Sequence, residues 1–158
     1  MPGKYLPDDV FQDFTCIDRA YLEKYRIRGI LTDLDDTLAE HNHPSPHPAF
    51  ENWLAFLRSM NVRVCILSNN GTRRTKAFAE RYSLPYIPNA YKPRRYYYRK
   101  AAAVLDLACE DCLFLGDQLF TDIRGAKKSG LRAVKTLPLG NRSNWFIKFK
   151  RKLEEWYG

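Results

Sequence analysis

The chain contains 158 residues, of which 45% are hydrophobic and 28% are charged, and its formal net charge at pH 7 is +8. A chain of this length and composition is expected to form one domain with a sizeable core, and it has neither an apolar run of about 18 residues that could span a membrane nor the apolar core of an N-terminal secretory signal. We therefore expect a cytoplasmic protein, and the positive charge favours an anionic partner such as nucleic acid, anionic lipid or a phosphorylated substrate.

Residues 1–25 are predicted to form an N-terminal extension that packs over an edge of the core. Within it, Leu6, Val10, Phe11 and Phe14 are spaced so that they could share one side of a short helical piece. The extension shows no residue pattern that indicates chemistry.

The segment at residues 28–38 joins an apolar run to three carboxylates, Asp33, Asp35 and Asp36. The apolar run predicts a buried strand, and if the strand continues through Asp33, the side chains of Asp33 and Asp35 point to the same side. Two such carboxylates repel each other and lose hydration, and a hard divalent cation such as Mg²⁺ would relieve both costs. A surface turn after a strand, where Asp and Thr are common, explains this segment equally well.

Two groups of residues have the composition of zinc sites, but neither completes one. His41, His43 and His47 lie among three prolines, which predicts a loop directly after the acidic segment, and no Cys or carboxylate completes a ligand set there. Cys109 and Cys112 form a lone CxxC pair without two further ligands at suitable spacing. We therefore favour a polar loop that could contact a substrate, and reduced thiols near the start of a strand.

Strands and helices are predicted to alternate along the rest of the chain. Apolar spacing predicts helices over residues 49–60, 72–82, 96–107 and 123–129, and apolar runs predict strands over residues 62–67, 86–87, 112–115 and 131–135. This alternation is typical of an α/β domain with a mainly parallel sheet and helices on both of its faces.

Polar residues follow the ends of four predicted strands: Asp33 and Asp35, Ser68, Lys92, and Asp117. In parallel sheets binding sites lie beyond the carboxyl ends of the strands, so we expect these side chains to converge. Such a set suits phosphoryl transfer: a carboxylate attacks phosphorus, a second acid moves protons, and a hydroxyl and an ammonium bind the phosphate oxygens. Bound Mg²⁺ would offset the repulsion between the nucleophile and the phosphate.

These motifs resemble those of the haloacid dehalogenase superfamily of phosphatases over nearly the whole chain. The matching segments are Asp33-Leu34-Asp35-Asp36-Thr37, Ser68 after the second strand, Lys92 in Tyr91-Lys92-Pro93, and the segment from Gly116-Asp117 to Asp122. The resemblance implies a single domain over residues 1–158, with a three-layer α/β/α Rossmann-like fold and an aspartyl-phosphate mechanism.

The same resemblance implies roles for individual residues. Two carboxylates would carry the chemistry, Asp33 as the nucleophile and Asp35 as the general acid and base. Three residues would bind phosphate: Ser68, Asn69 and Lys92. Three would bind Mg²⁺: the Asp33 carboxylate, the Asp35 backbone carbonyl and Asp117. Two would support the site: Thr37 and Asp122.

The superfamily inserts cap domains after the first motif or between Ser68 and Lys92, and both intervals are too short for one here. We therefore expect no cap domain and an open site, which the family associates with macromolecular or bulky substrates. A finer resemblance is to the YqeG-type bacterial phosphatases and the mitochondrial phosphatidylglycerophosphate phosphatases of subfamily IIIA. It rests on Leu6-Pro7-Asp8, Ser68-Asn69-Asn70, Lys92-Pro93 and the segment from Gly116 to Asp122.

This finer resemblance implies removal of the terminal phosphate from phosphatidylglycerophosphate to give phosphatidylglycerol. Asp36 stands where related chains often carry Asn, and it adds a charge near the metal. The alternative is a phosphatase that acts on nucleic-acid ends, a phosphoprotein or a soluble phosphorylated metabolite. A non-enzymatic basic adaptor is disfavoured, because the four motifs are intact.

Two basic and aromatic stretches bear on the choice of substrate. Residues 141–158 are predicted to form a helix with aromatic side chains on one face and Lys148, Arg151 and Lys152 on the other. This helix suits either the surface of an anionic membrane or docking of its aromatic face on the sheet. Residues 92–100 are expected to rim the site, where they could attract an anionic membrane at the inner face, follow a nucleic-acid backbone or form a solvated helix face.

Overall fold

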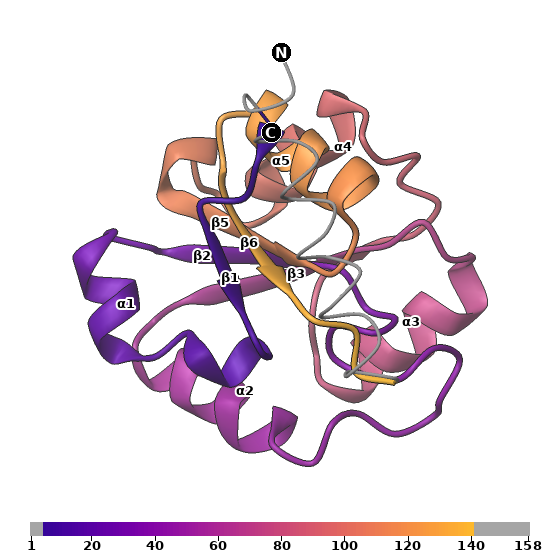
Figure 1. Cartoon of the computed structure of the whole chain (residues 1–158). Coiled ribbons are helices and arrows are strands. Elements are labelled where there is room, and N and C mark those ends of the chain that lie inside the picture. The colour runs from indigo at the N-terminus through magenta and orange to yellow at the C-terminus, as the bar shows by residue number, and fades with distance from the viewer. Residues whose placement is uncertain (1–4, 141–158) are drawn as a thin grey trace.

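A parallel sheet forms the centre of the protein in the computed structural model, which describes residues 5–140 (Figure 1). Its strands are β1 (Asp9–Phe11), β2 (Gly29–Thr32), β3 (Arg63–Leu67), β4 (Tyr86–Ile87), β5 (Cys112–Gly116) and β6 (Arg132–Thr136). They are hydrogen-bonded in the order β1-β6-β5-β2-β3-β4, and every neighbouring pair is parallel. The acidic segment therefore follows a central strand, β2, between β5 and β3.

Five α-helices connect these strands, and they cover both faces of the sheet (Figure 1). They are α1 (Arg19–Lys24), α2 (Phe50–Ser59), α3 (Thr72–Arg81), α4 (Arg95–Val104) and α5 (Arg124–Lys128). Short 3₁₀ turns lie at Phe14–Cys16 and Cys109–Asp111, and a π-helical turn over Leu119–Ile123 leads into α5. The predicted helices are thus confirmed to within a few residues at their ends.

Alternation along the buried strands divides the core into two apolar layers. In β2, Ile30 faces a layer that contains Leu22, Leu54 and Phe78, and α1, α2 and α3 supply these residues. The next residue, Leu31, faces the opposite layer, which α4 and α5 cover with side chains that include Tyr98, Ala102 and Ala126. Because successive side chains of a strand point to opposite faces, one strand supports both layers. The predicted three-layer α/β/α fold is confirmed.

The N-terminal segment corrects the sequence prediction. Val10 and Phe11 belong to β1, which pairs in parallel with β6 at the edge of the sheet, and not to a helical piece. A strand of three residues is too short to show an alternating pattern, and it forms because β6 offers its edge backbone groups as partners. The predicted C-terminal helix at residues 141–158 lies outside the described residues.

The intervals between the motifs hold few elements. Between β2 and β3 the chain forms a loop and α2, and between β3 and Lys92 it forms α3 and β4. These described segments leave the carboxyl edge of β2 and β3 without a cap domain, as the sequence predicted. Among residues 5–140, no helix is both long enough and apolar enough to cross a membrane.

Candidate active site

The carboxyl ends of the central strands bring the predicted site residues together. Asp33 follows β2, Ser68 follows β3 and Asp117 follows β5. The Asp33 amide donates to the Leu115 carbonyl at 2.9 Å, and the Ser68 amide to the Ile87 carbonyl at 3.0 Å, so sheet pairing positions both. A cleft of about 280 Å³ opens here, and its lining residues are all polar or charged: Asp33, Asp35, Asp36, His41, Asn42, Ser68, Asn69, Asn70, Lys92, Gln118, Thr121 and Asp122.

A buried lysine lies between two carboxylates at the centre of this cleft. The Lys92 ammonium is 3.0 Å from Asp33 Oδ1 and 2.5 Å from Asp122 Oδ1, and the Lys92 side chain is only 2% exposed. Burial alone would lower the pKa of Lys92, but the charges of Asp122 and Asp33 outweigh burial and raise it. Burial and the charge of Asp122 raise the pKa of Asp33, and Lys92 opposes that rise. Lys92 therefore carries a permanent positive charge beside Asp33.

Neighbouring groups fix the positions of Lys92 and Asp122. Asn69 Oδ1 accepts a hydrogen bond from the Lys92 amide at 2.8 Å, and the Lys92–Pro93 peptide bond is cis. Asp122 Oδ2 accepts from the Gln118 amide at 3.1 Å. A Cβ atom at Gly116 would lie 2.5 Å from Asp122 Oδ2, so only glycine leaves room for this carboxylate. Close packing against Asp122 thus explains why the fourth motif has glycine at position 116.

Three carboxylates at the same edge form a candidate metal centre. Asp33, Asp117 and Asp122 each place one oxygen within 4.8 Å of the others. Asp117 Oδ1 is buried and has no hydrogen-bond partner among the described residues. Burial and the charges of Asp122 and Asp33 raise the pKa of Asp117. An orphaned buried oxygen within a carboxylate cluster suits a hard divalent cation, so these residues fit the metal that the motifs imply.

The structure therefore adds Asp122 to the carboxylates that could hold a metal. The family resemblance implied only a supporting position for Asp122 and placed the Asp35 backbone carbonyl on the metal. The Asp35 side chain lies in a different set of contacts, described below, and the role of its carbonyl stays a prediction. Because Asp122 also accepts from Lys92, one carboxylate links this lysine to the candidate metal centre.

Four donors hold the Asp35 carboxylate. Oδ1 accepts from the Asn42 amide at 3.0 Å and from Arg74 Nη2 and Nε at 2.9 and 3.3 Å, while Oδ2 accepts from Asn70 Nδ2 at 2.6 Å. Burial would raise the pKa of Asp35, but these hydrogen bonds and the charge of Arg74 lower it below the usual range. Asp35 is thus kept ionised and in a fixed orientation.

The other predicted residues lie around this centre. Ser68 is buried, and its Oγ accepts from the Asn70 amide at 3.0 Å. Thr37 is buried, and its Oγ1 has no hydrogen-bond partner in the part of the chain that the structure describes. Asn69 lines the cleft and positions the Lys92 backbone, so this contact explains its place in the motif. Binding of phosphate by Ser68, Asn69 and Lys92 stays a prediction.

The loop after the acidic motif closes one side of the cleft. Asp36 has a positive φ of 61°, a conformation that Asn and Asp adopt more readily than most residues, and its Oδ1 accepts from the His41 amide at 3.2 Å. His43 Nδ1 lies 3.1 Å from the Ser45 amide, and His47 Nδ1 accepts from the Ala49 amide at 3.1 Å. The His43 and His47 rings thus contact their own loop, and the His47 ring also packs edge-on against Phe14.

Arg74 and Asn70 are the site residues that sequence reasoning missed. Arg74 reaches Asp35 from the first turn of α3, and its Nη1 also donates to the His43 carbonyl at 2.5 Å. Asn70 links the end of β3 to Asp35. In sequence Arg74 is one of several basic residues on an amphipathic helix, and nothing in that pattern separates it from the others. Asn70 is next to a predicted site residue, and that adjacency was the available signal.

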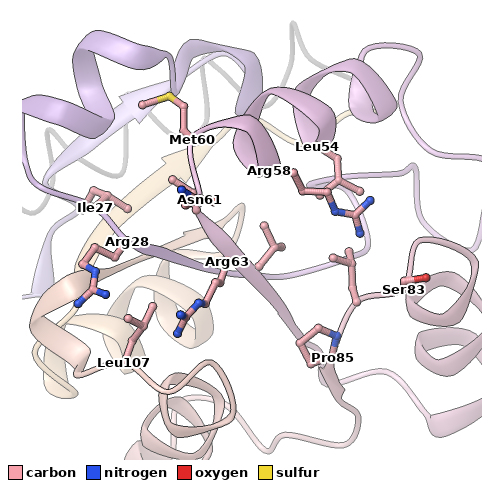
Figure 2. Close-up of a pocket in the computed structure, with 13 residues that line it drawn as sticks. Ile27, Arg28, Leu54, Arg58, Met60, Asn61, Arg63, Ser83, Pro85 and Leu107 are labelled. Atoms are coloured by element: carbon pink, nitrogen blue, oxygen red, sulfur yellow. The ribbon is translucent and has the colours of Figure 1, made fainter.

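A second, larger cavity lies at the opposite edge of the sheet (Figure 2). It measures about 630 Å³ and contains Arg58 and Arg63, but no carboxylate lines it among the described residues. Arg58 Nη2 donates to the Tyr82 carbonyl at 2.5 Å, and Arg63 Nη1 to the Leu105 carbonyl at 2.6 Å. Tyr82 and Leu105 are the C-caps of α3 and α4, so both arginines satisfy helix ends. Among the described residues, this cavity therefore offers no carboxylate that could attack phosphorus or hold a divalent cation.

Comparisons with known proteins cover the segments that form this cleft. The family model described as haloacid dehalogenase-like hydrolase matches residues 18–130. The probable phosphatase YqeG of Bacillus subtilis (strain 168) is 33% identical over 150 residues, which cover 95% of this chain and 87% of that protein. Both similarities include the strands that carry the acidic, serine, lysine and glycine-aspartate motifs.

Solved structures share the fold at lower sequence identity. A putative subfamily III A hydrolase of this superfamily from Legionella pneumophila has a TM-score of 0.58 and 22% identity, over 74% of this chain and 70% of that one. The cobalt-bound deoxy-D-mannose-octulosonate 8-phosphate phosphatase of Haemophilus influenzae has a TM-score of 0.55 and 13% identity, over 84% of this chain and 90% of that one. Since the family model spans most of the chain and the Bacillus relative matches nearly all of it, this chain belongs to the haloacid dehalogenase-like hydrolases.

Proposed function

We propose that the protein is a Mg²⁺-dependent phosphomonoester hydrolase that works through an aspartyl-phosphate intermediate. One observation carries this proposal: Asp33 lies 3.0 Å from the buried Lys92 ammonium, within a carboxylate cluster that includes the orphaned oxygen of Asp117. A nucleophilic carboxylate next to a fixed cation and a candidate metal centre is what attack on an anionic phosphate requires. The Bacillus relative, described as a probable phosphatase, supports the same class of reaction.

In the first step, an Asp33 oxygen attacks phosphorus and the bond from phosphorus to the ester oxygen breaks. Asp35 gives a proton to the departing oxygen, and the product alcohol leaves. Lys92 neutralises charge on the phosphoryl oxygens from its buried position between Asp33 and Asp122. A divalent cation held by Asp33, Asp117 and Asp122 would withdraw further negative charge from the phosphoryl group when bound.

In the second step, a water oxygen attacks phosphorus, and the bond from phosphorus to Asp33 breaks. Asp35 accepts a proton from the water, and phosphate leaves while Asp33 regains its carboxylate. The hydrogen bonds from Asn42, Asn70 and Arg74 favour ionised Asp35, so the described geometry is prepared for this second proton transfer. The first proton transfer requires protonated Asp35, a form that the same hydrogen-bond donors disfavour. Hydrolysis of esters with good leaving groups should therefore depend less on Asp35 than hydrolysis of alkyl phosphates does.

For the substrate, we propose phosphatidylglycerophosphate. The resemblance of the motifs to subfamily IIIA supports this choice, and so does the open cleft, which described segments leave without a cap. Exposed aromatic rings lie near the site residues in sequence: Tyr91 is 60% exposed, Tyr96 64% and Phe120 50%. Arg94 lies 5.7 Å from the Tyr91 ring and Lys100 lies 6.0 Å from the Tyr96 ring. Aromatic rings paired with cations suit the interface of an anionic membrane.

The first experiment measures phosphate release from phosphatidylglycerophosphate in mixed micelles and from a panel of soluble phosphomonoesters that includes a 5′-phosphorylated oligonucleotide. Each reaction is run with Mg²⁺ and with a chelator, and Asp33→Asn is the control variant. We expect metal-dependent release from the lipid that the variant lacks. Release from the oligonucleotide or small esters alone would overturn the lipid assignment, and no release from any ester would overturn the phosphatase assignment.

Membrane association is tested separately by sedimentation with vesicles. We expect the protein to bind vesicles that contain phosphatidylglycerol more strongly than vesicles of phosphatidylcholine, with weaker binding at high salt because basic residues contribute. Replacement of Tyr91 and Tyr96 by Ala should reduce binding to the anionic vesicles. Equal binding to both kinds of vesicle would contradict this part of the proposal.

A further inference from the structure

A groove along α3 adjoins the active-site cleft. It measures about 700 Å³, and it shares Asn42 and Asn70 with the cleft. Pro44, Ala77 and Phe78 give it an apolar lining. Asn42 and Asn70 both contact Asp35, so a substrate whose terminal phosphate lies beside Asp33 would reach the groove by passing over these two residues.

The charged residues that line the groove are all arginines: Arg73, Arg74 and Arg81. Arg73 and Arg81 are separated by eight residues on α3, so they lie on the same side of the helix, two turns apart. Arg74 lies where groove and cleft meet, because it contacts Asp35 in the cleft. No carboxylate lines the groove among the described residues.

These arginines differ in whether their guanidinium groups already have hydrogen-bond or ion-pair partners. Arg74 donates to Asp35 and to the loop at His43. Arg81 lies 3.8 Å from Glu51, and both of these side chains are more than half exposed, so their pairing is weak. In the described part of the chain, the Arg73 guanidinium has neither a hydrogen bond nor an ion pair. Arg73 thus has its full donor set available at an apolar groove.

We infer that this groove binds a second anionic group of the substrate, together with the apolar part next to it, and that Arg73 is its principal ligand. This inference rests on the proposed function, since it assumes a phosphomonoester at Asp33. A guanidinium binds phosphate oxygens through two parallel hydrogen bonds, and a groove with apolar walls strengthens that pairing. The groove therefore selects phosphomonoesters that carry a phosphodiester or similar anion a few bonds away, and phosphatidylglycerophosphate and its deacylated headgroup share that chemistry.

The specificity test compares two soluble substrates: glycerol 3-phosphate, which has the monoester alone, and the deacylated headgroup of phosphatidylglycerophosphate, which has a monoester and a diester. For the wild type we expect a higher kcat/KM with the headgroup. Arg73→Gln should lower the ratio of the two kcat/KM values about tenfold, because a charge-assisted hydrogen bond is lost, and should leave glycerol 3-phosphate turnover nearly unchanged. An unchanged ratio, or an equal loss with both substrates, would overturn the inference.

Matched variants separate the groove from general charge. Lys76→Gln removes a positive charge from the same helix, but Lys76 pairs with Glu80 at 3.9 Å and does not line the groove. We expect this variant to keep the wild-type ratio. Ala77→Glu places a negative charge in the groove and should lower the ratio more than Ala77→Gln does. If Lys76→Gln lowers the ratio as much as Arg73→Gln, the effect belongs to overall charge and the groove is not the site.

A binding measurement tests the groove without any turnover. Glycerophosphoglycerol contains the diester and no monoester, and calorimetry with the Asp33→Asn protein reports its affinity. We expect binding that Arg73→Gln weakens about tenfold, whether or not the protein hydrolyses any ester. Binding that is absent, or that Arg73→Gln leaves unchanged, would overturn the groove assignment even if the protein is an active phosphatase. If a short-chain acylated form binds more tightly than glycerophosphoglycerol, the natural ligand of the groove is the lipid. If the two affinities are equal, the natural ligand is a soluble ester.

Discussion

The two edges of the sheet carry cavities of different size and opposite character. The cavity at the amino edge measures about 630 Å³, and the carboxyl edge carries the cleft of about 280 Å³ with the groove of about 700 Å³ beside it. At the amino edge Arg58 and Arg63 donate to helix-terminal carbonyls, so each has a structural partner. At the carboxyl edge Lys92 and Asp122 are almost fully buried, and Asp117 keeps an orphaned oxygen. Cavity volume therefore does not identify the site. Buried charged groups that lack enough hydrogen-bond partners do identify it.

Sheet topology explains this difference. A helix between two parallel strands runs back from the carboxyl edge to the amino edge, so α3 and α4 end at the amino edge at Tyr82 and Leu105. The terminal carbonyls of these helices carry partial negative charge, which arginines there satisfy. At the carboxyl edge carboxylates follow β2 and β5, and one of them, Asp117, keeps a buried oxygen without a hydrogen-bond partner among the described residues. The carboxyl edge is therefore where we propose that a cation and a phosphate bind.

The largest expected effect comes from Asp33→Asn. Asparagine keeps the shape of the side chain but cannot form an acyl phosphate, so phosphate release should fall by at least about 10³-fold. The same change should not reduce metal-free thermal stability, because it removes a buried charge that Asp122 repels. Single-turnover assays and thermal melting check the two parts. Residual activity within tenfold of the wild type would exclude Asp33 as the nucleophile.

Metal and pH should act together on stability. The pKa values of Asp33 and Asp117 are raised to about 7 and about 8 in the fold. At pH values above the ordinary pKa of Asp, the folded protein therefore binds more protons than the unfolded chain. The stability that these groups provide is present at acid pH and is lost as pH rises through the raised values. Metal-free protein should thus melt at a lower temperature near about pH 8 than near about pH 5, because the buried carboxylates ionise.

Mg²⁺ should reverse that loss, because it neutralises the ionised carboxylates. We expect the rise in Tm on addition of Mg²⁺ to be larger near about pH 8 than near about pH 5, where protons compete for the same oxygens. Asp117→Asn serves as the comparison, and it should show a weaker pH dependence and a smaller response to Mg²⁺. A response to Mg²⁺ that is equal in Asp117→Asn and the wild type would place the metal elsewhere.

The sequence predicted the fold class and most of the edge that carries the site. Asp33, Ser68, Lys92 and Asp117 each follow a strand, and the carboxyl ends of parallel strands share one edge, so strand order and spacing were enough to bring them together. The helices were predictable because their apolar residues recur at three- and four-residue spacing. Strand β1 was not predictable, because its three residues form a strand by pairing with the edge of β6 and not through a local sequence pattern.

Side-chain direction was the part that the sequence could not supply. Asp35 and Asp122 are both acids in recognised motifs, yet only Asp122 joins the carboxylate cluster. The reason is tertiary: Arg74 and Asn70 hold Asp35, while Gln118 and Lys92 hold Asp122. Contacts of this kind join residues that lie far apart in sequence, so no spacing rule predicts them.

Arg74→Ala should have an intermediate effect. It removes two hydrogen bonds to Asp35 and one to each of the Glu40 and His43 carbonyls, so it frees both the proposed general acid and base and the adjoining loop. We expect kcat to fall by about 10- to 100-fold, since small displacements of a catalytic group have costs of this size. Arg74→Lys should retain only part of the wild-type kcat, because an ammonium cannot form the paired hydrogen bonds of a guanidinium. If Asp35→Asn and Arg74→Ala combine additively in kcat, Arg74 does not act through Asp35.

The smallest effect is expected at the amino edge, where Arg63→Ala should change stability and not activity. Arg63 Nη1 donates to the Leu105 carbonyl at 2.6 Å, and loss of that bond should destabilise the fold by about 1 kcal/mol, which lowers Tm by about 3 °C. Urea unfolding measures the stability, and kcat/KM with a soluble phosphomonoester should stay within about twofold of the wild type, because the two edges share no side chain. A large loss of kcat/KM in a variant that remains folded would show that the larger cavity takes part in the reaction, and the distinction between a structural and a catalytic edge would be wrong.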